Sequence, residues 1–543
     1  MIPLPAETVA AAFTATAAAH PTNPFIAVLE ETAAAYGIPA GEITYAQAAH
    51  RIAALTESYR AAGYGHGHRV GLLLENRPDF FLHWFALNAL GVSVVPINPD
   101  LRSYELEYLV AHSELVAAVA LPSRHADITT AAQSRPVAVF GPNESPLPII
   151  TPAPSNTPPN ADTECALLYT SGTTGRPKGC ILPNEYFLAA GAWYAGIGGL
   201  IELRPGQERM LTPLPVFHMN AMAYSAMAMV VTGGCLIVLD RFHPRTWWRS
   251  VRESRASVLH YLGVMPPMLM AAPESTDDKS HAVRFGFGAG VDRALHAAFE
   301  SRFGFPLIEA WAMTETGAGA VVVASREPRH VGTSNFGRPE PEVETRITLE
   351  DGTEAATDQP GELLVRHAGP TPGFGFFRAY LKDPEATAAA WAGGWFHTGD
   401  VVRRTQDGSL CFIDRRKNVI RRSGENISAV EVESVLLRHP AIRHAAVAPA
   451  PDPVRGDEVF ACIVPESPLR SPEDRTRLAN DIVAWCLDRL AYFKAPGYIA
   501  FVPEVPLTST QKIQRGSLRD LVAASIGADT CIDTRALKRR VPA

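Results

Sequence analysis

The chain has 543 residues, of which 47% are hydrophobic and 19% charged, so it can bury large cores and is too long for one ordinary domain. Its formal net charge of −7, with lysines and arginines not gathered into one stripe, argues against nucleic-acid binding. Seven scattered cysteines form no Cys-x-x-Cys pair, which excludes a zinc spacing and a disulfide framework. We therefore expect a cytoplasmic protein of at least two domains.

Two segments near the start and middle of the chain could suggest a membrane protein. Residues 1–20 are rich in alanine but lack lysine and arginine and contain Glu7, so they do not resemble a secretory signal. We expect a surface helix with a frayed end. Residues 219–239 are uncharged, but Thr-Gly-Gly at 232–234 divides them into a helix-like run and a short strand. No transmembrane segment is expected.

Short apolar strands alternate with helical stretches along the chain, which is typical of α/β layers with mainly parallel sheets. Residues 70–74 favour a strand, residues 80–90 a helix and residues 91–96 a second strand, which together predict a βαβ unit. Residues 142–162 are rich in proline, serine and asparagine and are expected to connect this region to the next motif.

That motif occupies residues 169–179 and reads Tyr-Thr-Ser-Gly-Thr-Thr-Gly-Arg-Pro-Lys-Gly. Its glycines permit close backbone approach, and its hydroxyls, N–H groups and lysine can face polyphosphate oxygens. The spacing is not that of a Walker A loop, and a loop of this kind taken alone is more often an ordinary turn. As a phosphate loop it supplies these candidates: Thr170, Ser171, Gly172, Thr173, Thr174 and Lys178.

Four later segments accompany this loop in the order found in one family. They are residues 309–317, 395–400, 414–428 and 506–515. Together the segments resemble the adenylate-forming superfamily, which contains acyl-CoA synthetases, luciferases and the adenylation domains of peptide synthetases. The resemblance runs from about residue 43 to 521. It implies a large, multi-layer N-terminal domain (1–414) with mainly parallel sheets and a small, mobile α+β C-terminal domain (415–543), with a hinge near Lys417.

The resemblance also implies roles in the large domain, where each residue alone would more often be ordinary surface or core. Glu315 is expected to hold Mg²⁺, a hard ion that takes one or two carboxylates plus phosphate oxygens. Thr314 can donate a hydroxyl to phosphate. Asp400 is expected to accept both ribose hydroxyls, and Arg415 to reach the ribose or phosphate side. Trp311 stands where the family has tyrosine and can stack on adenine.

In the small domain, Lys512 is the expected catalytic cation, which neutralises charge between the attacking carboxylate and the α-phosphate. Because Lys512 is remote from the phosphate loop in sequence, the two domains must close together for adenylation. The resemblance then implies rotation about Lys417, with the loop at Gly424 forming the channel for the pantetheine thiol. The chain departs from the family pattern at Gln511 and Ala312, where glycine is usual.

The resemblance places the acyl pocket around residues 217–220, 263–265, 288–291 and the stretch after Trp311, and it assigns Gly288 and Ala289 to the bound nucleotide. His218 is expected near the substrate carboxylate or α-phosphate, although a lone histidine is more often structural. These stretches contain no acid or fixed cation, so a second charged group on the substrate is not favoured. Residues 215–220 and 242–248 faintly resemble carnitine/crotonobetaine-CoA ligases.

The resemblance therefore predicts an AMP-forming carboxylic acid:CoA ligase of fatty acid or carboxylic acid metabolism. It would use ATP, Mg²⁺ and CoA, convert the acid to acyl-AMP with release of pyrophosphate, and pass the acyl group to CoA. The alternatives are an enzyme that loads an acyl carrier protein, a catalytically silent binding protein of the same fold, and luciferase chemistry. The partners expected are small molecules and no nucleic acid. The sequence leaves a homodimer open.

Overall fold

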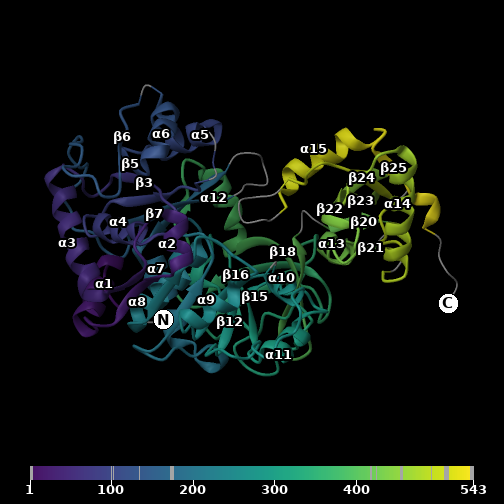
Figure 1. Cartoon of the computed structure of the whole chain (residues 1–543), viewed down its shortest axis with the longest axis horizontal. Helices are drawn as coiled ribbons and strands as arrows, with labels where there is room; N and C mark the ends of the chain where they lie inside the picture. Colours follow the sequence, from purple (N-terminus) through teal and green to yellow (C-terminus); the bar gives the residue numbers. More distant parts are fainter. Residues whose placement is uncertain are drawn as a thin grey trace.

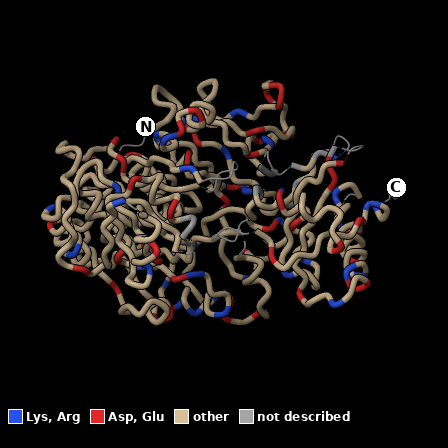
Figure 2. The backbone as a smooth tube through the Cα atoms, turned by 90° about the horizontal axis from the view of Figure 1, so that it is seen from above, with Lys and Arg blue, Asp and Glu red and all other residues tan. Residues whose placement is uncertain are grey.

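The computed structural model describes residues 4–99, 101, 103–133, 135–170, 177–263, 265–415, 419–422, 425–452, 456–490, 492–506 and 513–538. A large part, up to residue 415, and a small part, from residue 419, lie at opposite ends of the long axis (Figure 1). Lysine and arginine are interspersed with aspartate and glutamate over both parts (Figure 2).

The first large sheet has eight strands in the order β14-β13-β12-β11-β9-β10-β1-β2. Six central strands are parallel, and an antiparallel strand closes each edge. Every residue of β10 is buried, as expected for a strand covered on both faces. The strands are β1 (Pro24–Val28), β2 (Gly41–Thr44), β9 (Arg209–Thr212), β10 (Cys235–Val238), β11 (Val258–Leu262), β12 (Phe285–Ala289), β13 (Leu307–Trp311) and β14 (Val322–Val323).

The second large sheet has seven strands in the order β17-β8-β7-β4-β3-β5-β6. β3 and β4 precede and follow helix α4 in the chain and pair in parallel with each other, which confirms the predicted βαβ unit. The phosphate loop joins β7 to the antiparallel β8. The strands are β3 (Arg69–Leu73), β4 (Ser93–Pro96), β5 (Ala117–Ala120), β6 (Ala138–Phe140), β7 (Glu164–Thr170), β8 (Lys178–Pro183) and β17 (Ala379–Tyr380).

Helices fill the space between the two sheets and cover their outer faces. The largest core joins residues of both sheets to the middle helices α1 (Val9–Ala19), α3 (Tyr45–Ala61), α4 (Pro78–Asn88), α7 (Asn184–Gly196), η3 (Asn220–Ala226) and α8 (Met227–Thr232). A second core lies under α9 (Trp247–Glu253), α10 (Met265–Met270) and α11 (His296–Phe303), and a third under α5 (Ser103–Ser113) and α6 (His125–Ala132). The remaining short helices are α2 (Glu30–Tyr36), η1 (Pro122–Arg124), η2 (Gly199–Ile201), η4 (Gly317–Gly319), α12 (Pro384–Ala390) and η5 (Ala392–Gly394).

The helix expected at the start of the chain forms as α1 and lies at the surface, with residues 11, 14, 15, 18 and 19 exposed and its other face packed on the large domain. Helix α1 buries Val9 and Phe13 in the largest core. Its first N–H groups donate to two side chains from distant helices, with Val9 N 3.1 Å from Asn184 Oδ1 and Ala10 N 2.9 Å from Asn88 Oδ1. These contacts satisfy donors that a helix start leaves unpaired, so α1 is anchored inside the large domain.

The apolar stretch at residues 219–239 folds as predicted, into helix η3–α8 and strand β10 inside the large domain. Gly233 ends α8 with φ of 70°, a left-handed conformation that favours glycine. Among the helices of the described residues, none combines the length and the apolar character that crossing a membrane requires.

A four-stranded antiparallel sheet completes the large part, and a six-stranded sheet forms the small part. The former contains β15 (Val343–Thr348), β16 (Gly361–His367), β18 (Phe396–Arg404) and β19 (Leu410–Arg415). The latter contains β20 (Val419–Arg422), β21 (Glu425–Ser428), β22 (Ile442–Asp452), β23 (Gly456–Pro465), β24 (Tyr498–Phe501) and β25 (Cys531–Asp533), with α13 (Ala429–Leu436), α14 (Pro472–Leu487), α15 (Arg515–Ser525) and η7 (Arg535–Leu537). The expected α/β fold with a smaller α+β domain is confirmed. β19 runs to Arg415 and β20 begins at Val419, so the chain changes sheet between these two residues, just after the predicted boundary.

Candidate active site

The site is built at the carboxyl ends of three adjacent parallel strands, β11, β12 and β13, where α/β proteins commonly bind ligands. Two glycines let these strand ends approach closely. A Cβ atom added to Gly288 would lie 2.3 Å from the carbonyl oxygen of Tyr261, and one added to Gly263 would lie 2.0 Å from that of Gly290. Larger residues would therefore force these segments apart.

The structure brings the expected magnesium carboxylate close to Lys178, through the side chain of Tyr380. Glu315 follows β13 and is 7% exposed, and its Oε1 accepts a hydrogen bond of 2.9 Å from the hydroxyl of Tyr380. The Nζ atom of Lys178 lies 4.8 Å from the centroid of the same tyrosine ring and 3.9 Å from Asp383. Burial and the Glu315 carboxylate raise the pKa of Tyr380, so its hydroxyl stays protonated and donates. One tyrosine therefore links the two groups.

A second contact joins the expected adenine and ribose residues. The indole Nε1 of Trp311, at the end of β13, donates a hydrogen bond of 2.9 Å to Oδ2 of Asp400 on β18. Both side chains are buried, with exposures of 6% and 1%. The Asp400 backbone N–H donates to Thr398 Oγ1 at 3.0 Å. Since an N–H donated to a carboxylate is a strong hydrogen bond, Trp311 fixes where the Asp400 carboxylate lies.

The other predicted residues have the following places. Thr170 ends β7 and pairs in register with Lys178. Thr314 lies partly buried in the turn before Glu315, and His218 lies partly buried just before η3. Ala289 ends β12 with an exposed side chain, and the backbone of Arg415 pairs in register with Asp400. Seven predicted residues lie outside the described part of the chain: Ser171, Gly172, Thr173, Thr174, Lys417, Gly424 and Lys512.

The donor set fits a magnesium ion. Across the described residues no group of three or more histidine, cysteine, aspartate or glutamate side chains converges as an all-protein metal cage. Mg²⁺ usually takes one or two carboxylates and completes its shell with phosphate oxygens and water. The single carboxylate of Glu315, held by a neutral tyrosine hydroxyl, matches that pattern.

Tyr380 is a site residue that the sequence analysis missed. It lies on the two-residue strand β17, which pairs with β8, and 65 positions separate it from Glu315. No periodicity or turn signal identifies a strand of two residues. Only the sheet pairing shows that this tyrosine belongs to the site.

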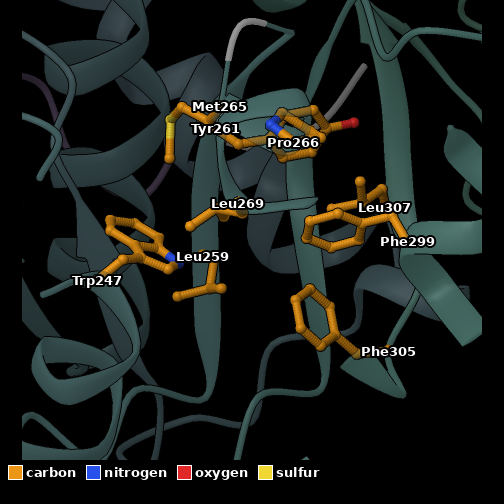
Figure 3. Close-up of a pocket in the computed structure, with 9 residues that line it drawn as sticks. All are labelled: Trp247, Leu259, Tyr261, Met265, Pro266, Leu269, Phe299, Phe305 and Leu307. Atoms are coloured by element: carbon orange, nitrogen blue, oxygen red, sulfur yellow. The ribbon is translucent and has the colours of Figure 1, made fainter. Parts of the chain in front are cut away.

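A small apolar cavity lies against β11 and β13, among side chains of helices α9, α10 and α11 (Figure 3). Its free volume is about 10 Å³, which suffices for about one water molecule. Apart from Pro266, the side chains that line it belong to the second core, and none carries a charge. It is therefore a packing defect and not the acyl site. The lining residues are Trp247, Leu259, Tyr261, Met265, Pro266, Leu269, Phe299, Phe305 and Leu307.

Comparison with protein families agrees with this geometry. The AMP-binding enzyme family matches residues 13–375, and the AMP-binding enzyme C-terminal domain matches residues 431–512. The chain belongs to the AMP-binding enzyme family. The resemblance to the adenylate-forming superfamily is thereby confirmed.

Two curated relatives are similar over nearly their whole length. A sulfoacetate–CoA ligase from Cupriavidus necator is 31% identical over 524 residues, which cover 94% of this chain and 97% of the relative. A crotonobetaine/carnitine–CoA ligase from Citrobacter koseri is 29% identical over 496 residues, which cover 88% and 93%. These relatives confirm the predicted reaction class, an AMP-forming acid:CoA ligase that uses ATP, Mg²⁺ and CoA, and they confirm the faint resemblance to carnitine-type ligases.

Solved structures share the fold. An anthranilate CoA ligase in complex with anthranoyl-AMP gives a TM-score of 0.79 at 21% identity, covering 97% of this chain and 99% of that one. The o-succinylbenzoate CoA synthetase from Bacillus subtilis, in complex with ATP and a magnesium ion, gives 0.76 at 24% identity, covering 94% and 99%.

Proposed function

We propose that Lys178, Glu315, Trp311 and Asp400 form the ATP site in which this enzyme activates a carboxylic acid. The observation that carries the proposal is the Tyr380 hydroxyl, which connects Glu315 to the strand that carries Lys178. Glu315 would hold Mg²⁺, which supplies positive charge at the phosphate oxygens when bound. Asp400, oriented by Trp311, would accept the ribose hydroxyls.

The reaction places few covalent demands on the protein. In the first step, an oxygen of the acid attacks the α-phosphorus of ATP, and the bond to pyrophosphate breaks. In the second step, the thiol sulfur of CoA attacks the acyl carbonyl carbon, AMP leaves, and the thiol proton passes to solvent. Positioning and positive charge are the main contributions that the chain can make. We propose that Lys512 supplies charge in the first step and that rotation about Lys417 brings Gly424 to the thiol in the second.

We place the reaction in the cytoplasm, because all seven cysteines are free thiols, as suits a reducing compartment. A homodimer is the oligomeric form that we propose to test. Light scattering on the purified enzyme would distinguish it from a monomer.

The test is release of pyrophosphate that depends on the acid, measured over short, medium-chain and aromatic acids with and without CoA. We expect release to require Mg²⁺ and to rise with CoA as acyl-CoA forms. Glu315→Gln should lose most of this activity, while Glu7→Gln, a substitution far from the site in sequence, should retain it. Release that CoA leaves unchanged would indicate a carrier protein as the acceptor. Silence with every acid would contradict the proposal.

A further inference from the structure

Helix α5 contacts both ends of the phosphate loop, and the proposed mechanism does not use it. The Tyr108 hydroxyl donates a hydrogen bond of 3.0 Å to the carbonyl oxygen of Pro177, the last residue before β8. His112 Nδ1 lies 2.7 Å from the hydroxyl oxygen of Tyr169, the last but one residue of β7. One helix therefore reaches the chain where it enters the loop and where it leaves it.

The spacing of these two side chains along α5 explains how they act together. Residues four positions apart lie one above the other on the same face of a helix. The rings of Tyr108 and His112 accordingly stack, with centroids 5.1 Å apart and planes at 26°. Another face of α5 buries Leu109 and Val110 in a core that also contains Leu167 of β7. The helix is thus anchored on the strand that leads into the loop.

The strand pair at the base of the loop accommodates the Tyr169 ring. Tyr169 lies opposite Gly179 in the register of β7 and β8. A Cβ atom added to Gly179 would lie 3.3 Å from the end of that ring, so glycine leaves the ring its room. Burial raises the pKa of Tyr169, while burial and the Lys382 ammonium lower the pKa of His112. Both groups are therefore neutral at neutral pH, and an uncharged hydrogen bond joins them.

A third contact connects the same end of α5 to the magnesium side of the site. Lys382 Nζ donates to the carbonyl oxygen of His112 at 3.0 Å and lies 2.9 Å from Glu114 Oε1. A helix leaves its last carbonyl groups without a partner in the helix, and the ammonium supplies one. Lys382 comes two residues after Tyr380, whose hydroxyl donates to Glu315. α5 is therefore connected both to the loop and to the segment that orients the carboxylate.

We propose that Tyr108 and His112 are positioning residues, which hold the two ends of the phosphate loop so that it fits the phosphate groups that ATP carries beyond AMP. Each side chain acts through the end of the loop that it contacts and does not touch the nucleotide. The inference rests on the proposed function, because it gives α5 a part in the ATP site of that reaction. Loss of either contact should weaken binding of the outer phosphates and spare binding of the adenosine part.

Binding of two nucleotides tests the inference without requiring turnover. One probe is α,β-methylene-ATP, in which a methylene group replaces the oxygen at the bond that the first step breaks. The other is AMP, which lacks the outer phosphates. Isothermal titration with Mg²⁺ present should show that Tyr108→Phe and His112→Leu each weaken binding of the ATP analogue about three- to tenfold, the effect of one hydrogen bond. Affinity for AMP should not change.

Two further variants separate positioning from general damage to the fold. His112→Asn keeps a hydrogen-bonding atom attached to Cγ, as Nδ1 is, and should recover most of the affinity for the ATP analogue. Tyr45→Phe is the matched control for Tyr108→Phe. It also removes a phenol that donates to a backbone carbonyl, that of Met229, at 2.7 Å, but this hydrogen bond joins α3 to α8. Affinity for both nucleotides should stay at the wild-type value.

Steady-state kinetics provide a second readout. In Tyr108→Phe the KM for ATP in pyrophosphate release should rise about three- to tenfold, with little change in kcat. Thioester formation from supplied acyl-AMP should keep its wild-type rate, because acyl-AMP carries only the α-phosphate. A purely structural role would slow both half-reactions.

The outcomes separate the inference from the proposed reaction. Equal weakening of both nucleotides in the two variants, or unchanged binding of the ATP analogue, would overturn the inference. Selective weakening without acyl-CoA formation from any acid would contradict the ligase reaction alone. Acyl-CoA formation with unchanged nucleotide binding in both variants would contradict the inference alone, and a wild type that binds neither nucleotide would contradict both.

Discussion

At the scale of single residues, two hydrogen bonds hold the proposed ATP site in shape. Trp311 donates to Asp400, and Tyr380 donates to Glu315. Each joins segments that are distant in sequence, and each places a neutral donor on a carboxylate that has its own proposed task. Removing the first hydrogen bond should therefore affect the binding of ATP, and removing the second should affect the binding of Mg²⁺.

Substituting Trp311 tests the ribose side. Trp311→Phe removes the N–H donated to Asp400, and hydrogen bonds to charged groups contribute roughly 1.5–3 kcal/mol. We expect KM for ATP to rise roughly tenfold or more, with a smaller change in kcat. Steady-state kinetics with varied ATP provide the measurement. Trp247→Phe is the control, since that buried indole nitrogen has no partner among the described residues. Equal effects on KM in both variants would contradict the role of Trp311.

Substituting Tyr380 tests the metal side. Tyr380→Phe leaves the ring beneath Lys178 but removes the hydroxyl that orients Glu315. The Mg²⁺ concentration for half-maximal activity should rise about three- to tenfold. Titrating Mg²⁺ at saturating ATP gives this value. Tyr36→Phe removes a hydroxyl that donates to Asp240 O at 3.3 Å, far from the carboxylate, and should leave the titration unchanged. An unchanged Tyr380→Phe curve would exclude a role in metal binding.

At the scale of elements, the loop after β12 contacts helix α13 of the small part. Arg438 Nη2 lies 2.6 Å from Asp292 Oδ1, and Ser434 Oγ donates to Asp292 Oδ2 at 2.7 Å. Burial opposes ionisation, but the Arg438 and Ser434 hydrogen bonds outweigh it and lower the pKa of Asp292. The contribution of Asp292 to stability is therefore present at neutral pH, and it is lost as pH falls below the ordinary carboxyl range.

This contact stabilises one arrangement of the two parts, so breaking it should affect the two half-reactions unequally. We expect Arg438→Ala to slow one of them about threefold and to spare or accelerate the other. Pyrophosphate release reports the first half-reaction, and thioester formation from supplied acyl-AMP reports the second. The paired exchange Asp292→Arg with Arg438→Asp should restore the wild-type ratio. Equal slowing of both half-reactions would show that the contact only supports folding.

Elements with strong local patterns could be predicted from the sequence, and those decided by distant contacts could not. The βαβ unit of β3, α4 and β4 and the helix–strand division near Gly233 follow from apolar runs and a glycine step. Which face of helix α1 is buried could not be predicted, because alanine at most positions gives no polar and apolar faces to distinguish. Its burial depends on Asn88 and Asn184, which only the tertiary fold brings to it. The Trp311–Asp400 hydrogen bond likewise could not be predicted from the sequence, although both residues were predicted to bind the nucleotide.

At the scale of the whole molecule, the small part has hydrophobic cores of its own. Its two clusters cover the two faces of the six-stranded sheet, and neither includes a residue of the large part. The small part also contains a buried cluster of three charged side chains. Lys538 Nζ contacts Glu458, and Arg422 Nε lies 2.9 Å from the same carboxylate. Burial lowers the pKa of Lys538 to about 8, and the Glu458 carboxylate opposes this shift.

The sign of this shift predicts how stability depends on pH. In the folded state Lys538 loses its proton near pH 8, whereas in the unfolded chain it keeps the proton to about pH 10.4. The unfolded state then binds more protons, so the contribution of Lys538 to the free energy of unfolding should rise between these values. Denaturant unfolding of the wild type and of Lys538→Met at several pH values isolates this contribution. A difference that stays constant with pH would contradict the lowered pKa.

Separate cores also determine how the chain responds to heat. Cooperative unfolding requires that the loss of one region removes the packing of another, and no hydrophobic cluster of the described residues contains side chains of both parts. A calorimetric scan should therefore resolve two endotherms, one for each part. A single melting temperature would be an average without thermodynamic meaning for this enzyme. A nucleotide held by the large part alone would raise one endotherm and leave the other in place.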